Sequence, residues 1–187
     1  MAYIDVIQHA DAEGELLDIY DNLVQTRGKL AEVHKIQSLH PQSIVHHMDF
    51  YMTIMFGKSP LKRYQREMIA VVVSATNQCP YCVTHHGDAL MHFWKDQDKV
   101  ERLAEDFHFV NLNESDAALC NYAQQLTKRP NKVDESNHIE SLKKAGCSDR
   151  AILDAALVTS YFNFVNRMVL GLGVHLEAEG GAGYNYD

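Results

Sequence analysis

The spacing of apolar residues is the feature of this sequence that most restricts its fold. Apolar side chains recur every three or four positions in residues 16–24 and again in residues 142–157. This period places them along one face of an α-helix. The two-residue alternation of a half-buried strand is not evident. The pattern therefore predicts an all-α fold.

Proline, glycine and capping residues divide the chain into helices. Pro is tolerated in a first turn, Ser, Asn and Asp cap N-termini, and Gly suits a C-terminal stop. These signals predict the following helices: one that begins after Asp11 and ends at about Arg27, one from Pro41 to about Gly57, one that follows Pro60 and covers about 61–76, one from about Cys79 to Phe93, one from Asn113 or Ser115 to about Lys128, one from Asp134 to Ala145 and one from Ser148 to about Leu170. The Val-rich part of the third segment is also compatible with a strand.

Two segments of the chain resemble each other weakly. Residues 65–86 and 150–171 align so that 71–74 (Val-Val-Val-Ser) matches 156–159 (Ala-Leu-Val-Thr). This match hints at a duplicated helix pair. Phe164 and Arg167 then occupy the positions of Cys79 and Cys82, so only the first copy carries thiols.

Length and composition indicate an ordinary globular protein. The 187 residues suit a single domain over 1–187, with a mobile tail from about 178. Acidic residues outnumber basic ones, 25 to 17, and no basic run is present, so nucleic acid is not an expected partner. No apolar run reaches the length of a membrane span, and no signal peptide is evident, so we expect a cytoplasmic protein without membrane contact. Cysteines in such a compartment are typically free, catalytic or metal-bound.

Two cysteines lie three positions apart in Cys79-Pro80-Tyr81-Cys82. The first turn of a helix brings such sulfurs close enough to form a disulfide with little backbone movement. A helix N-terminus also favours the thiolate through its positive potential. His85 and His86 follow three and four positions after Cys82, on roughly the same helical face. The pattern predicts a redox-active pair with a base in reach.

Glu67 carries a charge within a segment that is otherwise rich in apolar residues. A buried carboxylate without a partner costs several kcal/mol, so we expect a hydrogen-bonding or ionic partner, and one of the two histidines is the natural candidate. The alternative is an exposed helix charge paired with Arg63 or Arg66.

These residues form the pattern Glu67-x11-Cys79-x2-Cys82-x3-His86, which resembles the alkylhydroperoxidase D branch of the carboxymuconolactone decarboxylase superfamily, in particular its peroxidase-related subgroup. The resemblance implies a helical fold that assembles into trimers or hexamers. It also implies that Cys82 attacks a peroxide, hydrogen peroxide or a small organic hydroperoxide, while Glu67 and His86 accept its proton and Cys79 resolves the sulfenic acid. The reductant is then an external dithiol, a lipoyl-bearing or thioredoxin-like protein, and no cofactor is implied. Tyr81 and His85 are secondary candidates.

Thioredoxin-like chemistry favours a different nucleophile. In such pairs the first, more exposed cysteine usually attacks, which would be Cys79. His86 is one helical turn from Cys82 but two from Cys79, and a base must approach its proton to about 3 Å. This geometry favours Cys82.

Three other functions remain open at this stage. Cys79, Cys82, His85 and His86 are a possible zinc set, but one short helix rarely encloses a tetrahedral ion, so we expect no metal. A non-enzymatic redox sensor or binding module would use the same thiols without turnover. A lactone decarboxylase would need a proton-transfer histidine and no cysteine pair.

The remaining candidate residues have structural explanations. We expect Cys120 and Cys147 to be small core or half-buried residues. Surface or interface positions are expected for three histidines: His46, His47 and His92. A core face or a subunit interface is expected for five residues of the last helix: Tyr161, Phe162, Phe164, Val165 and Met168.

Overall fold

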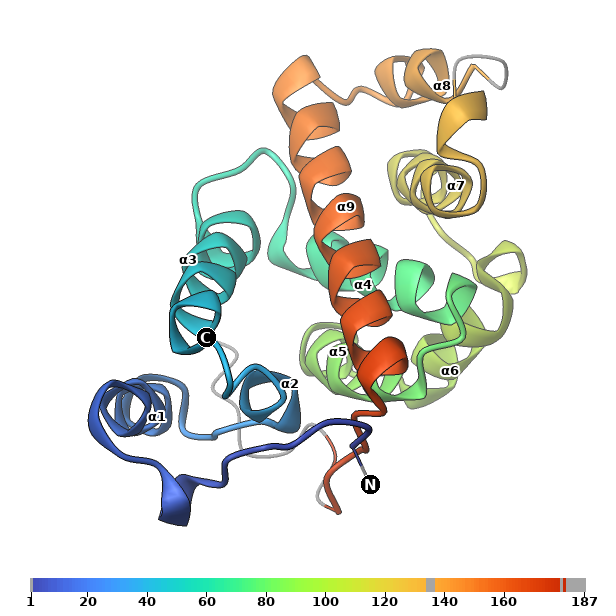
Figure 1. The fold of residues 1–187 in the computed structure, drawn as a ribbon. Coiled ribbons are helices and arrows are strands. Elements are labelled where there is room, and N and C mark those ends of the chain that lie inside the picture. The colour runs from blue at the N-terminus through green and yellow to red at the C-terminus, as the bar shows by residue number, and fades with distance from the viewer. Residues whose placement is uncertain (1, 134–136, 179, 181–187) are drawn as a thin grey trace.

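The protein is all-α, as its sequence predicts. The computed structural model describes residues 2–133, 137–178 and 180, and these residues form helices and no strand (Figure 1). The helices are α1 (Gly14–Arg27), α2 (Glu32–Lys35), α3 (Pro41–Phe56), α4 (Arg63–Thr76), α5 (Pro80–Trp94), α6 (Gln97–Asp106), α7 (Glu114–Lys128), α8 (His138–Lys144) and α9 (Asp149–Leu172), with short 3-10 helices at His9–Asp11, Phe107–Phe109 and Pro130–Lys132. None of the helices in this part of the chain is long and apolar enough to cross a membrane.

Helix α4 lies at the centre of the structure. It contacts α5, α6, α7 and α9, and residues 65–74 are all buried. Figure 1 shows the long helix α9 crossing in front of α4 and α5. A helix that is enclosed on every side can be apolar around its whole circumference, which explains the valine run. The strand alternative for this segment is therefore wrong.

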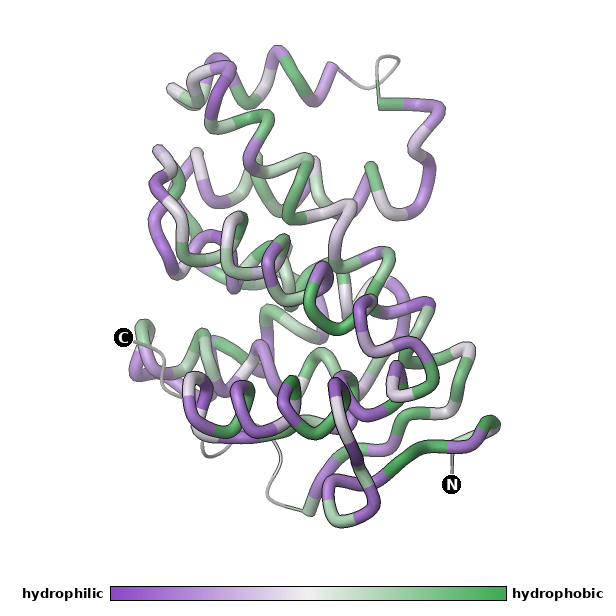
Figure 2. The backbone as a smooth tube through the Cα atoms, turned by 60° about the vertical axis from the view of Figure 1, so that its left-hand side comes forward, coloured by the Kyte–Doolittle hydropathy of each residue, from purple (hydrophilic) through white to green (hydrophobic). Residues whose placement is uncertain are grey.

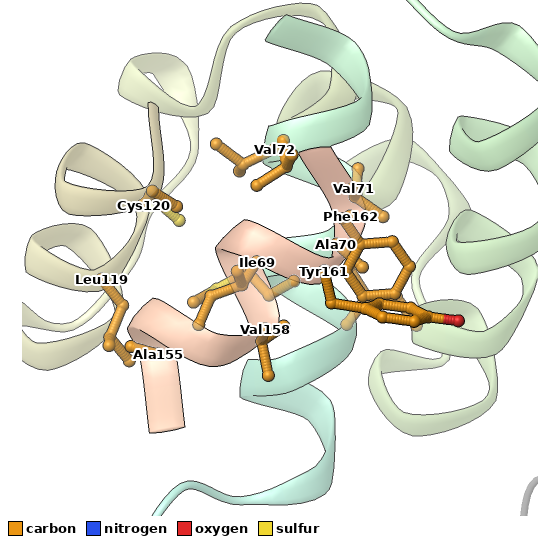
Figure 3. Close-up of a cluster of buried hydrophobic side chains, with 14 of the residues drawn as sticks. Ile69, Ala70, Val71, Val72, Leu119, Cys120, Ala155, Val158, Tyr161 and Phe162 are labelled. Carbon is orange, nitrogen blue, oxygen red and sulfur yellow. The ribbon is translucent and has the colours of Figure 1, made fainter. Parts of the chain in front are cut away.

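The main hydrophobic core joins α4, α7 and α9. Figure 3 shows Ile69 of α4 in one cluster with Leu119 of α7 and with Ala155 and Val158 of α9. All four side chains are fully buried. Cys120 is also buried here and Cys147 is half-buried, so the structural assignment of both cysteines is confirmed.

A second, smaller cluster joins α1 to α3. Tyr20 and Leu23 of α1 are buried with Ile44 and Met48 of α3. Figure 2 shows hydrophobic and hydrophilic residues alternating along the helices, as expected when one face is buried. Helices α1 and α3 also supply residues to one side of the site described below.

Most of the predicted helix ends are confirmed. Gly28 ends α1 in the left-handed conformation, with φ of 78°, and Pro41 is the first residue of α3. The side chains of Asn113 and Ser148 accept hydrogen bonds from the backbone N–H groups three residues later, at 2.9 and 3.2 Å. The expected cap at Asp134 lies outside the described residues, as do 179 and 181–187 of the tail.

The hint of a duplicated helix pair is not matched by the helices themselves. Residues 65–86 contain the break between α4 and α5, whereas residues 150–171 belong to the single uninterrupted helix α9. Helices α2 and α6 were not expected from the periodicity. Asp96 caps α6 by accepting a hydrogen bond from the backbone N–H of Lys99 at 3.0 Å.

Candidate active site

The turn between α4 and α5 is fixed by hydrogen bonds to α9. Asn77 donates to the buried Asn166 at 2.9 Å, and Asn166 donates to Ser74 at 3.1 Å. The backbone N–H of Cys79 donates to the carbonyl of Ser74 at 2.9 Å, and Gln78 takes a left-handed conformation with φ of 55°. This turn places Cys79 at the N-cap of α5, directly before the first helical residue, Pro80.

Cys79 and Cys82 are free thiols that contact each other in the first turn of α5. Both are buried, with 0% and 2% of their surface exposed. Hydrogen bonds from the side chain and backbone N–H of Cys82 lower the pKa of Cys79, against the effect of burial. The pKa of Cys82 is raised because it donates to Cys79 and because it is buried, although Asn166 opposes this. The pair is thus suited to carry one negative charge, which rests on Cys79.

Glu67 is fully buried and binds both His86 and Arg63. Burial alone would raise its pKa, but His86 and Arg63 together hold the pKa below its ordinary value. The His86 Nδ1 atom lies 2.6 Å from Oε2 of the carboxylate, and Arg63 binds Oε1. A carboxylate only accepts hydrogen bonds, so Nδ1 carries a proton and the Nε2 atom of a neutral His86 is a base.

The expected histidine partner of Glu67 is therefore confirmed. The alternative of an exposed charge is wrong, although its suggested partner Arg63 does bind the carboxylate. Arg66 instead donates to the backbone carbonyls of Met55 and Leu61, at 2.6 and 3.0 Å.

A cavity of about 70 Å³ lies next to Cys82 and His86. Most of its wall is apolar, and Cys79 is not part of it. The ring of Phe162 meets that of His86 edge to face at 4.4 Å between centroids. The remaining lining residues come from α1 (Arg27), α2 (Val33, His34), α3 (His47, Met48, Tyr51), α5 (Tyr81, His85, Ala89) and α9 (Tyr161, Val165).

Tyr81 and His85 bind Glu177, a residue in the segment that follows α9. The Glu177 carboxylate accepts hydrogen bonds from Tyr81 at 3.0 Å and from the backbone N–H of Glu32 at 2.8 Å, and it lies 2.9 Å from His85 Nε2. The hydrogen bonds from His85 and from the backbone N–H of Glu32 outweigh burial and lower the pKa of Glu177 to about 2. His85 and His86 thus have different carboxylate partners. Among the described residues, no three His, Cys, Asp or Glu side chains converge as a metal site.

The position of His47 differs from the prediction. It is buried rather than a surface residue, because α3 packs against α9 and the Nε2 atom of His47 lies 2.5 Å from the Tyr161 hydroxyl. Burial lowers the pKa of His47 to about 4 and that of His34 to about 3. His46 is exposed and His92 half-buried.

The residues of the last helix are divided between core and surface. Tyr161, Phe162 and Val165 are buried, whereas Phe164 is 53% exposed. Met168 is half-buried. Three of these residues also line the cavity, a role that helical periodicity alone does not indicate.

The helical fold is that of AhpD-like, peroxidase-related proteins. An uncharacterized peroxidase-related protein from Silicibacter sp. TM1040 has the same fold, with a TM-score of 0.87, 28% identity and coverage of 98% of this chain and 96% of that one. A structure described as an alkylhydroperoxidase AhpD core, from Ralstonia eutropha JMP134, matches with a TM-score of 0.86, 24% identity and coverage of 96% and 94%.

Within this class, residues 2–186 match the family model of PA26 p53-induced protein (sestrin), and the chain belongs to that family. Mouse Sestrin-3 is 28% identical over 169 residues, which make up 83% of this chain and 31% of Sestrin-3. The chain thus spans about a third of the length of that relative.

Proposed function

We propose that the protein is a thiol peroxidase that reduces hydrogen peroxide or small organic hydroperoxides through Cys79 and Cys82. One observation carries this proposal: Cys82 and the carboxylate-bound His86 line the same mostly apolar cavity. A nucleophile, a base and space for a small substrate are therefore next to one another. The AhpD-like fold and the peroxidase-related relative support the same class of reaction.

The first step begins with the ionisation of the cysteine pair. In our proposal, His86 accepts one of the two thiol protons, and Glu67 stabilises the resulting imidazolium. The remaining proton lies between the two sulfurs and rests mainly on Cys82, as the opposed pKa shifts indicate. Transfer of this proton to Cys79 produces the Cys82 thiolate, which faces the cavity.

The Cys82 thiolate then attacks the terminal peroxide oxygen. An S–O bond forms, the O–O bond breaks, and the leaving alkoxide takes the proton from His86 to become an alcohol. Cys82 is oxidised to a sulfenic acid. Cys79 next loses its proton to His86 and attacks the Cys82 sulfur, and the expelled hydroxide takes that proton to leave as water. The product is the Cys79–Cys82 disulfide.

An external dithiol must reduce this disulfide to complete the cycle. We propose a lipoyl-bearing or thioredoxin-like protein for this role, in the cytoplasm, and we propose that the peroxidase itself works as a homo-oligomer, a trimer or hexamer. No bound cofactor or metal takes part in the scheme. The burial of both sulfurs supports a small reductant group that enters by the cavity, on the side of Cys82.

Turnover of cumene hydroperoxide with a dithiol donor tests the proposal. We expect the wild-type protein to be active, Cys82→Ser and Cys79→Ser to lose turnover, and Cys147→Ser to keep it, because Cys147 is a half-buried thiol outside the cavity. Full activity of Cys82→Ser would show that the assigned nucleophile is wrong.

Two rival functions predict different results. A wild-type rate equal to that of a free thiol, together with reversible disulfide formation, would favour a redox sensor or binding module. Complete processing of a cyclic acid by the Cys79→Ala and Cys82→Ala variants would favour a lactone decarboxylase.

A further inference from the structure

A chain of hydrogen bonds with a fixed direction runs toward the cavity from the backbone of α2. The side-chain nitrogen of Gln37 lies 2.9 Å from the carbonyl oxygen of Val33 and 2.8 Å from Nδ1 of His47. A backbone carbonyl only accepts, so the Gln37 group that touches it is the NH2 donor. The same NH2 donates its second hydrogen to His47, and Nδ1 therefore carries no proton.

The tautomer of His47 follows from this contact. Burial lowers the pKa of His47 to about 4, so the ring is neutral at physiological pH and has its single proton on Nε2. The Nε2 atom lies 2.5 Å from the Tyr161 hydroxyl oxygen. In this contact the imidazole N–H donates and the phenol oxygen accepts. Tyr161 therefore cannot donate its hydroxyl hydrogen to His47.

The hydroxyl hydrogen of Tyr161 is left for a ligand in the cavity. Tyr161 lines the cavity together with Cys82, and burial raises its pKa, so the hydrogen is retained. The charge of a Cys82 thiolate raises this pKa further, so the two groups are electrostatically coupled. No acceptor for this hydrogen occurs among the hydrogen bonds of the described residues. Figure 3 shows the hydroxyl at the end of the ring that points away from Leu119 and the packed core.

A second polar group in the cavity, the His34 ring, has a buried nitrogen without a partner among the described residues. The Nδ1 atom of His34 is buried and makes no hydrogen bond within the described part of the chain. Buried polar groups in folded proteins are nearly always paired, so the unpaired His34 nitrogen and the unused Tyr161 hydrogen point to a ligand or water in the cavity that pairs with them.

We propose that Tyr161 is a further catalytic residue, which donates a hydrogen bond to the leaving oxygen of an organic hydroperoxide as Cys82 attacks. This inference rests on the proposed peroxidase function and adds to it a substrate class, a hydroperoxide with an apolar substituent that packs against Met48, Phe162 and Val165. Negative charge develops on the leaving oxygen when the O–O bond breaks, and a preoriented donor stabilises it. His47 and Gln37 are positioning residues that keep the donor directed into the cavity.

Single-turnover oxidation of Cys82 in a Cys79→Ser background tests this inference. We expect Tyr161→Phe to slow sulfenic acid formation with cumene hydroperoxide by about 100-fold, the usual effect of losing one such donor. Tyr122→Phe is the matched control, because Tyr122 is equally buried but lies on α7, outside the cavity. Cumene hydroperoxide should also react faster than hydrogen peroxide, and equal rates would overturn the substrate class.

Alkylation by iodoacetamide separates catalysis from structure. The leaving group in this reaction is iodide, which, unlike the leaving oxygen of a peroxide, needs no hydrogen-bond donor to stabilise it. Tyr161→Phe should therefore leave the alkylation rate of Cys82 unchanged. A parallel loss of alkylation would mean that Tyr161 only maintains the site. Unchanged peroxide rates in Tyr161→Phe would refute the role of Tyr161 alone. A Cys79→Ser parent that reacts no faster than a free thiol would refute the peroxidase function itself.

A second variant keeps the tyrosine and reverses the hydrogen-bond chain. In Gln37→Glu the carboxylate accepts from Nδ1 of His47, so Nε2 becomes an acceptor and draws the Tyr161 hydrogen away from the cavity. We expect the peroxide rate to fall although Tyr161 is present. Nitrogen NMR of the His47 ring should show an unprotonated Nδ1 in the wild type and a protonated Nδ1 in the variant. A protonated Nδ1 in the wild type would overturn the inference.

Discussion

Replacement of Glu67 by glutamine removes a buried charge and keeps the shape of the side chain. The glutamine oxygen can still accept the hydrogen bond from His86, but Arg63 loses the carboxylate that balances its charge. Two further nitrogens of Arg63, Nε and Nη2, are already buried without hydrogen bonds in the described structure. The variant thus leaves an uncompensated cation beside the core.

The size of the effect follows from the burial of the pair. Two unit charges about 4 Å apart attract by about 4 kcal/mol at an effective dielectric constant of about 20. Breaking a buried pair by removing one partner costs about 3–5 kcal/mol. The Arg63 side chain is 18% exposed, and water there reduces the penalty. We therefore expect Glu67→Gln to lower the free energy of unfolding by about 3 kcal/mol and the rate of Cys82 oxidation by about 100-fold.

Urea unfolding followed by circular dichroism, together with single-turnover oxidation, measures both effects. Glu101→Gln is the matched control, because Glu101 is exposed on α6, and its stability should stay within about 0.5 kcal/mol of wild type. The double variant Arg63→Met, Glu67→Gln should regain most of the stability but none of the rate. If Glu67→Gln is as stable as the wild-type protein, the electrostatic reasoning is refuted. If the double variant recovers activity, the role of the carboxylate in proton transfer is refuted.

Three further predictions concern other parts of the molecule. The pKa of Glu177 is lowered from 4.5 to about 2, so its pairing with His85 stabilises the folded state above pH 4.5 and this contribution is lost as the pH falls through 2. Urea unfolding should show a loss of up to about 3 kcal/mol over this range that Glu177→Gln lacks, and identical pH profiles would contradict it. Burial raises the pKa of Cys120, so native-state alkylation mapped by mass spectrometry should label Cys147 and spare Cys120, and equal labelling would count against the packing described. Phe162→Ala should lower the free energy of unfolding by about 3–5 kcal/mol, because the ring is buried between helices, and a loss below about 1 kcal/mol would show that the site collapses around the gap.

The parts of the site that the sequence predicts are those set by local geometry. Cys79 and Cys82 meet because three residues span less than one helical turn, and Pro80 marks where that helix begins. Glu67 needed a partner because its segment was too apolar to be exposed, and His86 is that partner. The helical character of the segments and most of the helix ends were also predictable, because capping residues and periodicity are local features that extend over a few residues.

The parts that the sequence did not predict depend on long-range packing. Glu177 lies 92 positions from His85, and Tyr161 lies 114 positions from His47. Neither pair has a local pattern, so His47 was assigned to the surface or an interface and Tyr161 to the core or an interface. The valine run of α4 was ambiguous because burial on all sides removes the periodicity that distinguishes a helix from a strand.

Mass spectrometry after a brief peroxide pulse tests the central claim most directly. The reduced protein is treated with substoichiometric cumene hydroperoxide, quenched at increasing times and mapped for sulfenic acid and disulfide. We expect sulfenic acid to appear first on Cys82 and then to be replaced by a Cys79–Cys82 disulfide. Sulfenic acid that appears first on Cys79, or a pulse that leaves both thiols reduced, would contradict the account.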